Sequence, residues 1–429
     1  MHIDAMDAAA LARAEAELER RYAALRAEGL NLDLTRGKPA GDQLDLSAAL
    51  DGALDGGYRT EDGTDARGYG GSDGIVEARR LGAAWLGLAP DEVLAGGNSS
   101  LTLMYLFLLG AHRFGLDGPG SAWADDPAGA RFLCPAPGYD RHFAICEDLG
   151  IEMIPMPMTG EGPDMDRVEA LVAGDPWVRG MWCVPRYSNP TGETYSADTV
   201  RRIAALGRTA APGFRVMWDN AYAVHHLADP VAPLENVMAG CRAAGTEDSV
   251  VQFASTSKVT FAGAGVAFFG GSRRNVDWFR ARLSVMTIGP DKVNQLRHLR
   301  RLPDMDAVHA LMERHAALLR PKFDCVQRRL EAGLGNLGMG RWTDPDGGYF
   351  VSFWTRPGLA KETVRLAAQA GVRLTPAGAA YPRGEDPEDR HIRLAPSFPP
   401  LAEVDRAMEV FVTCVKLAAV RGARRTGAQ

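Results

Sequence analysis

Short apolar runs alternate with stretches of helical spacing between about residues 75 and 300. This alternation is typical of a mainly parallel sheet covered by helices on both faces, because each parallel connection must cross back over the sheet. After Pro303, a helical stretch from Met305 to Ala332 precedes a run, Gly347 to Phe353, that alternates as an antiparallel strand would. The strands expected in the larger sheet are residues 91–95, 131–134, 150–155, 180–184, 214–218, 249–254 and 266–270.

The length of the chain favours more than one lobe, since 429 residues are many for a single hydrophobic core. We therefore expect an α/β fold with a large domain (48–304), a smaller C-terminal α/β domain (305–429) and an N-terminal segment (1–47) packing with the small domain. A content of 46% hydrophobic and 24% charged residues is typical of a soluble globular protein. The net charge of -6 gives no bulk attraction to nucleic acid or to acidic membranes.

Cysteine and histidine spacing favours neither a disulfide framework nor a metal site. The six cysteines are scattered without CxxC or CxH spacing, and the doublet His225-His226 would point to opposite faces of a strand. The chain has no apolar run of the ~20 residues that cross a bilayer and no signal-peptide pattern at its N-terminus. We expect a cytoplasmic protein with reduced thiols, and a frayed basic tail around Arg421, Arg424 and Arg425.

Four reactive side chains follow predicted strands. Lys258 closes an apolar run that ends in small hydroxyl residues, and Asp219 and Tyr222 stand at the end of another. Asn189 lies on a proline-bounded turn after a third. An amine, an acid, a phenol and an amide at strand ends suit pyridoxal phosphate (PLP), whose aldehyde condenses with a lysine and whose pyridine nitrogen needs an acid partner.

Each of these residues has a distinct expected role. Lys258 would anchor the cofactor aldehyde and act as the base at the substrate α-carbon. Asp219 would keep the pyridine nitrogen protonated. Tyr222 and Asn189 would donate hydrogen bonds to the cofactor's phenolic oxygen. Taken singly, a lysine after a strand is usually a surface residue and an aspartate is often a helix cap, so only the set favours catalysis.

Further residues would hold the phosphate, the ring and the substrate. The segment 97–100 leads into an expected helix, where backbone N–H groups and hydroxyls form an anion site, although a simple N-cap has the same pattern. Tyr139 could stack on the cofactor ring, and the guanidinium of Arg393 could bind a substrate α-carboxylate through two hydrogen bonds. The residues expected at the phosphate are Asn98, Ser99, Ser100, Ser255 and Ser257.

The chain resembles the class I, fold-type I PLP-dependent aminotransferases over essentially its whole length. The resemblance is strongest to their subgroup Ic, which contains aspartate aminotransferases. It is carried by the stretches 33–39, 69–75, 96–100, 255–265 and 287–292. By resemblance, Lys258, Asp219, Tyr222, Asn189, Tyr139 and Arg393 match the family's functional residues, with Asn189 near the substrate as well as the cofactor.

The resemblance also implies a homodimer with shared active sites. Tyr69 matches a tyrosine that crosses the subunit interface to the partner's cofactor phosphate. Gly37, with Pro39, resembles the flexible N-terminal segment that closes over the substrate.

Two features depart from the family pattern. Many members place an arginine about eight residues after the lysine to hold the phosphate, but residues 265–267 here are Gly-Val-Ala. The arginine that typical aspartate aminotransferases offer to the distal carboxylate has no clear match. The candidates for that cation are Arg36, Lys38, Lys292 and Arg297.

The expected activity is transamination, with L-aspartate and 2-oxoglutarate as the leading pair. Two alternatives keep the same cofactor: an aminotransferase for an aromatic or neutral amino acid, and a PLP-dependent lyase or decarboxylase. A PLP-binding transcriptional regulator would need a basic helix-turn-helix module, which residues 1–30 do not provide.

Overall fold

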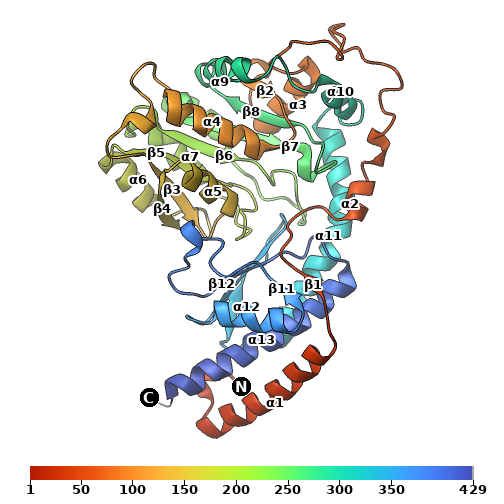
Figure 1. Ribbon diagram of the computed structural model, residues 1–429, viewed down its shortest axis with the longest axis vertical. Coiled ribbons are helices and arrows are strands. Elements are labelled where there is room, and N and C mark those ends of the chain that lie inside the picture. The colour runs from red at the N-terminus through yellow and green to blue at the C-terminus, as the bar shows by residue number, and fades with distance from the viewer. Residues whose placement is uncertain (428–429) are drawn as a thin grey trace.

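A seven-stranded sheet forms the centre of the larger lobe (Figure 1). The protein is described by a computed structural model, which covers residues 1–427. The strand order is β2-β8-β7-β6-β5-β3-β4; the strands from β7 to β4 run parallel, and β8 is antiparallel to both neighbours. The strands are β2 (Val93–Ala95), β3 (Arg131–Ala136), β4 (Glu152–Pro157), β5 (Val178–Cys183), β6 (Arg215–Asp219), β7 (Val250–Ser255) and β8 (Ala267–Gly271). The expected α/β fold with a mainly parallel sheet is confirmed.

Helices cover both faces of this sheet, and each face has its own apolar core. On one face, helices α4, α5 and α9 contribute Phe107, Ile145 and Phe279. On the other, α6, α7 and α8 contribute residues such as Val168 and Ile203. The helices of this lobe are α3 (Val76–Leu86), α4 (Ser100–Phe114), α5 (Asp140–Asp148), α6 (Met165–Gly174), α7 (Ala197–Ala205), α8 (Val237–Ala244), α9 (Arg273–Met286) and α10 (Lys292–Leu299).

A three-stranded antiparallel sheet, β12-β10-β9, forms the smaller lobe. It is joined to the larger lobe by the 30-residue helix α11, and both chain ends lie at its far side (Figure 1). Strands β1 and β11 form a separate parallel pair. The remaining elements are α1 (Ala8–Ala27), β1 (Leu32–Asp33), α2 (Gly41–Asp45), α11 (Met305–Leu334), β9 (Gly340–Trp342), β10 (Val351–Thr355), α12 (Ala360–Gln369), β11 (Val372–Arg373), β12 (His391–Leu394) and α13 (Leu401–Gly427).

The N-terminal helix packs with the smaller lobe. Leu11, Tyr22 and Leu25 of α1 share one apolar cluster with Val326 of α11 and Phe411 of α13. We therefore propose the division expected from the sequence: residues 1–47 with the small domain, 48–304 as the large domain and 305–429 as the small domain. Residues 428–429 lie outside the described part.

The prediction of a frayed C-terminal tail is wrong. Helix α13 continues to Gly427 and lies beside α1. Arg421 forms ion pairs with Glu15 (3.3 Å) and Glu19 (3.0 Å), and Arg424 also pairs with Glu15. The acidic face of α1 thus neutralises the basic end of α13, an arrangement that the sequence of either helix alone does not reveal.

Helix α11 links the two lobes, and its N-terminus is stabilised by the residue that precedes it. The Asp304 carboxylate accepts a hydrogen bond from the Ala307 N–H at 2.9 Å and so caps the helix. We expect Asp304→Ala to lower the free energy of unfolding by about 1 kcal/mol, the usual loss for an N-cap. Urea denaturation measures this. Glu313→Ala, an exposed position inside α11, is the control, and equal losses in both variants would contradict the capping role.

Candidate functional site

Asp219 and Lys258 lie at neighbouring ends of two parallel strands. Asp219 is the last residue of β6 and is in register with Phe253 of β7. The Asn220 N–H donates to the Phe253 carbonyl at 2.8 Å, which fixes the turn after β6. Lys258 ends the 3-10 turn Thr256–Lys258 that directly follows β7. Burial lowers the pKa of Lys258, and the negative charge of Asp219 partly offsets this effect.

Tyr222 lies beside the lysine amine. The Lys258 Nζ is 4.9 Å from the centre of the Tyr222 ring, which is 2% exposed. Burial raises the pKa of the Tyr222 phenol well above its usual value, so the phenol keeps its proton and remains a hydrogen-bond donor. Tyr349 and Phe350 pack edge-on against the same ring and close it off from solvent.

The backbone of the lysine turn is held by two buried side chains. The Tyr349 hydroxyl donates to the Lys258 carbonyl at 3.2 Å, and His225 Nε2 lies 3.3 Å from the same oxygen. Burial keeps the pKa of His225 well below its ordinary value, so its imidazole is neutral. A neutral imidazole that donates through Nε2 suits this carbonyl acceptor. His226 instead contacts the Tyr187 hydroxyl at 2.8 Å, so the two histidines have separate partners.

His142 is a site residue that the sequence analysis missed. Its Nε2 lies 3.2 Å from Asp219 Oδ2, and both side chains are 2% exposed. The imidazole stacks on Trp182 with 4.0 Å between ring centres and 5° between planes. The available signal was its place in the first turn of the helix after Tyr139, at the end of β3.

The other carboxylate oxygen of Asp219 is the clearest indication of a ligand. Asp219 Oδ1 is buried and has no hydrogen-bond partner within residues 1–427. A buried carboxylate oxygen without a partner costs free energy, so an arrangement of this kind calls for a donor from outside the chain. A protonated pyridine nitrogen is such a donor.

Arg393 brings the small lobe to the site. From β12, its Nη1 lies 3.4 Å from Asn189 Oδ1 and 3.5 Å from Asp140 Oδ1. Its Cζ is 4.8 Å from the centre of the Phe350 ring, and its Nε is buried without a partner in the described chain. These contacts are long, so the guanidinium retains capacity for an incoming carboxylate.

Tyr139 lies close to the acid rather than at the surface. Its ring meets His142 edge-on at 4.9 Å between ring centres. Burial, together with the nearby charge of Asp219, raises the pKa of Tyr139 to about 12. Tyr139, His142 and Trp182 thus form a continuous aromatic layer next to Asp219.

The expected phosphate residues come from two loops. The hydroxyls of Ser255 and Ser257 share a hydrogen bond, and both serines lie just before Lys258 in the chain. Ser99 stands at the N-cap of α4 but makes no side-chain capping bond, and Ser100 is the first helical residue. The simple N-cap interpretation therefore does not apply to Ser99. The Asn98 amide instead donates to the Gly263 carbonyl at 3.0 Å and ties the two loops together.

Tyr69 lies outside this cluster, whereas Gly37 borders it through the Phe350 ring. Tyr69 is 94% exposed on a loop whose carbonyls at Gly68 and Gly70 accept hydrogen bonds from Lys292 Nζ. Gly37 lies directly against the Phe350 ring: a Cβ at this position would be 2.0 Å from Phe350 Cζ. Any larger residue would displace the ring on which Arg393 rests.

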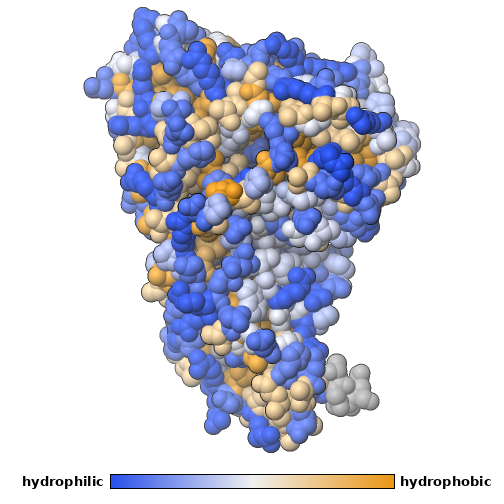
Figure 2. Space-filling model, turned by 180° about the vertical axis from the view of Figure 1, so that it is seen from behind, coloured by the Kyte–Doolittle hydropathy of each residue, from blue (hydrophilic) through white to orange (hydrophobic). Residues whose placement is uncertain are grey.

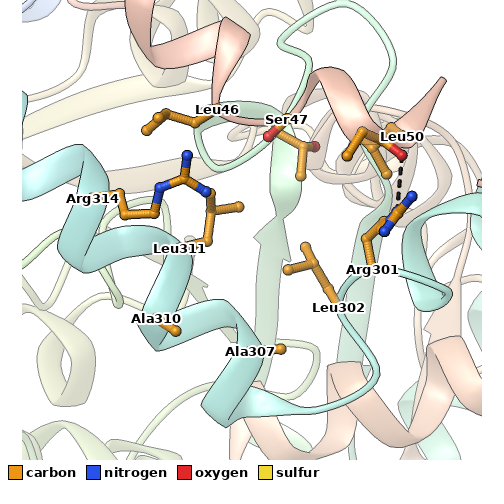
Figure 3. A pocket seen from close by; sticks show the side chains of 11 residues that line it. Leu46, Ser47, Leu50, Arg301, Leu302, Ala307, Ala310, Leu311 and Arg314 are labelled. Atoms are coloured by element: carbon orange, nitrogen blue, oxygen red, sulfur yellow. Dashed lines mark hydrogen bonds between the residues drawn. The ribbon is translucent and has the colours of Figure 1, made fainter.

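A separate pocket of about 340 Å³ lies between residues 46–50, which follow α2, residues 301–302 and α11 (Figure 3). Leucines and alanines form most of its wall, and Thr260 is its nearest approach to the lysine turn. None of the residues expected to bind cofactor or substrate lines it. It is therefore distinct from the site around Asp219.

The residues present at the site fit pyridoxal phosphate. A buried carboxylate oxygen lacks a donor, a buried amine with a lowered pKa lies near it, and phenols that keep their protons lie beside both. Within residues 1–427, no group of three or more His, Cys, Asp or Glu side chains could hold a metal ion, and no helix is long and apolar enough to cross a membrane.

Comparison with known proteins supports the same chemistry. The sequence model of the aspartate amino-transferase family matches residues 6–427. The chain belongs to the aspartate aminotransferase family. It is 51% identical over 413 residues to a putative aminotransferase of Mycolicibacterium smegmatis, covering 95% of each chain. It is 46% identical over 406 residues to an aspartate aminotransferase of Corynebacterium glutamicum, covering 94% of this chain and 93% of the relative.

Comparison with a solved structure shows that the fold is shared with a known aspartate transaminase. A crystal structure of an aspartate transaminase from Corynebacterium glutamicum superimposes with a TM-score of 0.95 at 45% identity, over 99% of both chains. This aspartate aminotransferase family consists of PLP-dependent enzymes of fold type I, so the protein is an aminotransferase of that fold. The resemblance stated from the sequence is confirmed.

The lysine that holds the cofactor can be identified without measuring activity. We expect borohydride reduction of the PLP-loaded aminotransferase to fix a pyridoxyl group on Lys258, at pH values where ordinary lysines are mostly protonated. Peptide mapping identifies the labelled residue. Lys292 is the internal control, because it is buried but its amine is occupied by two carbonyl oxygens. Labelling of Lys292 instead of Lys258 would contradict this prediction.

Proposed function

We propose that this aminotransferase transfers the amino group of L-aspartate to 2-oxoglutarate, giving oxaloacetate and L-glutamate. The observation that carries the proposal is the buried pair at adjacent strand ends: the unpartnered Asp219 oxygen and the Lys258 amine, whose pKa is lowered by burial. The family membership supports the reaction type, and the name of the Corynebacterium glutamicum relative supports aspartate as the amino donor.

Pyridoxal phosphate, when bound, supplies an aldehyde that takes up the amino group and a ring that withdraws electrons from the substrate α-carbon. Asp219 Oδ1 would accept a hydrogen bond from the pyridine nitrogen, while His142 holds Oδ2. Tyr222 and Asn189 would donate to the phenolic oxygen, and Tyr139 would pack on the ring. The phosphate would be held by Asn98, Ser99, Ser100, Ser255 and Ser257.

Lys258 would anchor the cofactor and then move a proton. Because burial lowers its pKa, a larger fraction of the amine is neutral near pH 7 than for an exposed lysine. A neutral Nζ would be the base that takes the proton from the substrate α-carbon and holds it beside the reacting atoms. Tyr349 and His225 fix the backbone carbonyl of Lys258, and a fixed backbone would help to keep the side-chain amine in place.

Arg393 would bind the substrate α-carboxylate, with Gly37 and Asn189 beside it. Asn189 and Asp140 accept long hydrogen bonds from Nη1 at 3.4 and 3.5 Å, Thr375 accepts one from Nη2 at 3.4 Å, and the buried Nε has no partner within the described residues. A guanidinium matches a carboxylate with two parallel hydrogen bonds, which orients the substrate as well as binding it. The α-carbon would then face Lys258.

Removal of the lysine amine tests the site. We expect Lys258→Ala to abolish turnover and the absorbance near the visible edge that covalently held cofactor gives, because the variant lacks the amine that would form that bond. The absorbance spectrum and a coupled assay measure the two losses. A variant that retains both would refute the role of Lys258. A panel of amino donors then separates the alternatives, because only transamination accumulates glutamate from 2-oxoglutarate.

We also propose a homodimer with shared active sites, working in the cytoplasm. Tyr69 is 94% exposed, and its loop lies against Gly289, next to the exposed Val285, Met286 and Ile288. Large exposed apolar residues gathered in this way are typical of an interface. Figure 2 shows hydrophobic residues on one face of the larger lobe, among hydrophilic ones.

Six free, buried cysteines are compatible with a reducing compartment.

Shared sites predict complementation between inactive variants. We expect Lys258→Ala and Tyr69→Ala to be inactive or weak alone, because one lacks the amine and the other lacks the phenol supplied to the partner's phosphate. Unfolded and refolded together, they should regain activity, since a mixed dimer contains one intact site. Activity of the mixture is compared with that of each variant refolded alone. No gain, with dimers present by light scattering, would contradict the crossing of Tyr69.

A further inference from the structure

Four cations were candidates for the distal carboxylate of the substrate, and three have other partners. Lys292 is 5% exposed, and its amine donates to two carbonyls of the Tyr69 loop. Arg297 donates to Asn294 at 2.7 Å and lines a pocket with Asn98 and Gly263, on the side where the phosphate is expected. Arg36 is paired with Asp33 at 3.2 Å.

Lys38 differs from the other three. Its side chain is exposed and forms no ion pair with any carboxylate in residues 1–427. Its Nζ lies 4.6 Å from the centre of the Phe398 ring, a weak contact at an exposed site that a carboxylate can replace. The cation is thus available for binding.

The backbone places Lys38 beside the segment that follows the strand of Arg393. The Ala395 N–H donates to the Leu34 carbonyl at 3.2 Å, and the Ser397 hydroxyl donates to the Lys38 carbonyl at 3.3 Å. Residues 34–38 therefore run along the segment that follows β12, the strand of Arg393.

The ring of Phe350 links the two basic residues. Gly37 contacts the Phe350 ring directly, and the Arg393 guanidinium carbon lies 4.8 Å from the centre of the same ring. Lys38 follows Gly37, so its Cα is about 3.8 Å from that of Gly37. A lysine has a flexible four-carbon stem, so its amine is not confined to its contact with the Phe398 ring.

We infer that Lys38 binds the distal carboxylate and thereby selects dicarboxylic amino acids and 2-oxo acids. This inference rests on the proposed transamination of aspartate. Both members of the proposed substrate pair carry a distal carboxylate, so one cation serves both halves of the reaction. Arg393 fixes the α-carboxylate, and Lys38 then distinguishes aspartate from a donor with an uncharged side chain.

The test compares donors in the half-reaction of the PLP-loaded enzyme, followed by its absorbance change with aspartate or alanine alone. We expect Lys38→Met to lower kcat/KM for aspartate about 10- to 100-fold, mainly through KM, because one charge-assisted hydrogen bond is lost. The value for alanine should change less than about 3-fold, and Lys38→Arg should keep most of the preference for aspartate. Arg36→Gln, two residues away and already paired with Asp33, is the matched control and should behave as the wild type.

The outcomes separate this inference from the proposed function. Equal losses with both donors, or an unchanged preference in Lys38→Met, would overturn the role of Lys38 alone. A wild-type enzyme that prefers alanine would overturn the aspartate assignment and the role of Lys38 with it. A loss confined to aspartate supports both.

Discussion

The charge on Asp219 is the constraint on which the rest of the site depends. A carboxylate that is 2% exposed is costly unless charge or hydrogen bonds compensate for it. One oxygen faces His142, which is held flat against Trp182 of the neighbouring strand β5. The other oxygen has no partner in the described chain, and the Lys258 amine interacts with the same charge from the end of β7. Asp219 therefore keeps one carboxylate oxygen without a hydrogen-bond donor, and a cationic ring nitrogen would supply that donor.

This arrangement needs both lobes. The large domain contributes Asp219, Tyr222 and Lys258 from the carboxyl ends of parallel strands, where ligand sites of open α/β sheets form. The small domain contributes Arg393 and the Tyr349 hydroxyl that holds the Lys258 carbonyl. Phe350 packs against Tyr222 and Arg393, so it joins the two residues across the boundary between the lobes. A shift of one lobe against the other would move the Arg393 guanidinium relative to the lysine amine.

The sequence allowed the fold and several strand ends to be predicted closely. The strands expected over 214–218 and 249–254 are found at Arg215–Asp219 and Val250–Ser255, because buried parallel strands leave a strong apolar signal. The strand expected over 91–95 begins at Val93 instead, since Pro90–Glu92 forms a 3-10 turn. His142, Asp140 and Tyr349 were missed. Each has its role only through a neighbour far away in the chain, and a lone histidine or tyrosine carries no periodic pattern.

The sequence by itself determined the alternation of strands and helices, and the amine, acid and phenol at the strand ends. These follow from local chemistry: the spacing of apolar side chains and the residues at which each run stops. Only the tertiary structure decided which partner each charge has. The ion pairs of Arg421 and Arg424 with α1 appear only in the folded structure. Likewise, only the structure shows that, among the four candidate cations, the side chain of Lys38 alone has no polar or charged partner within residues 1–427. Such pairings depend on distances between segments hundreds of residues apart, which no local pattern encodes.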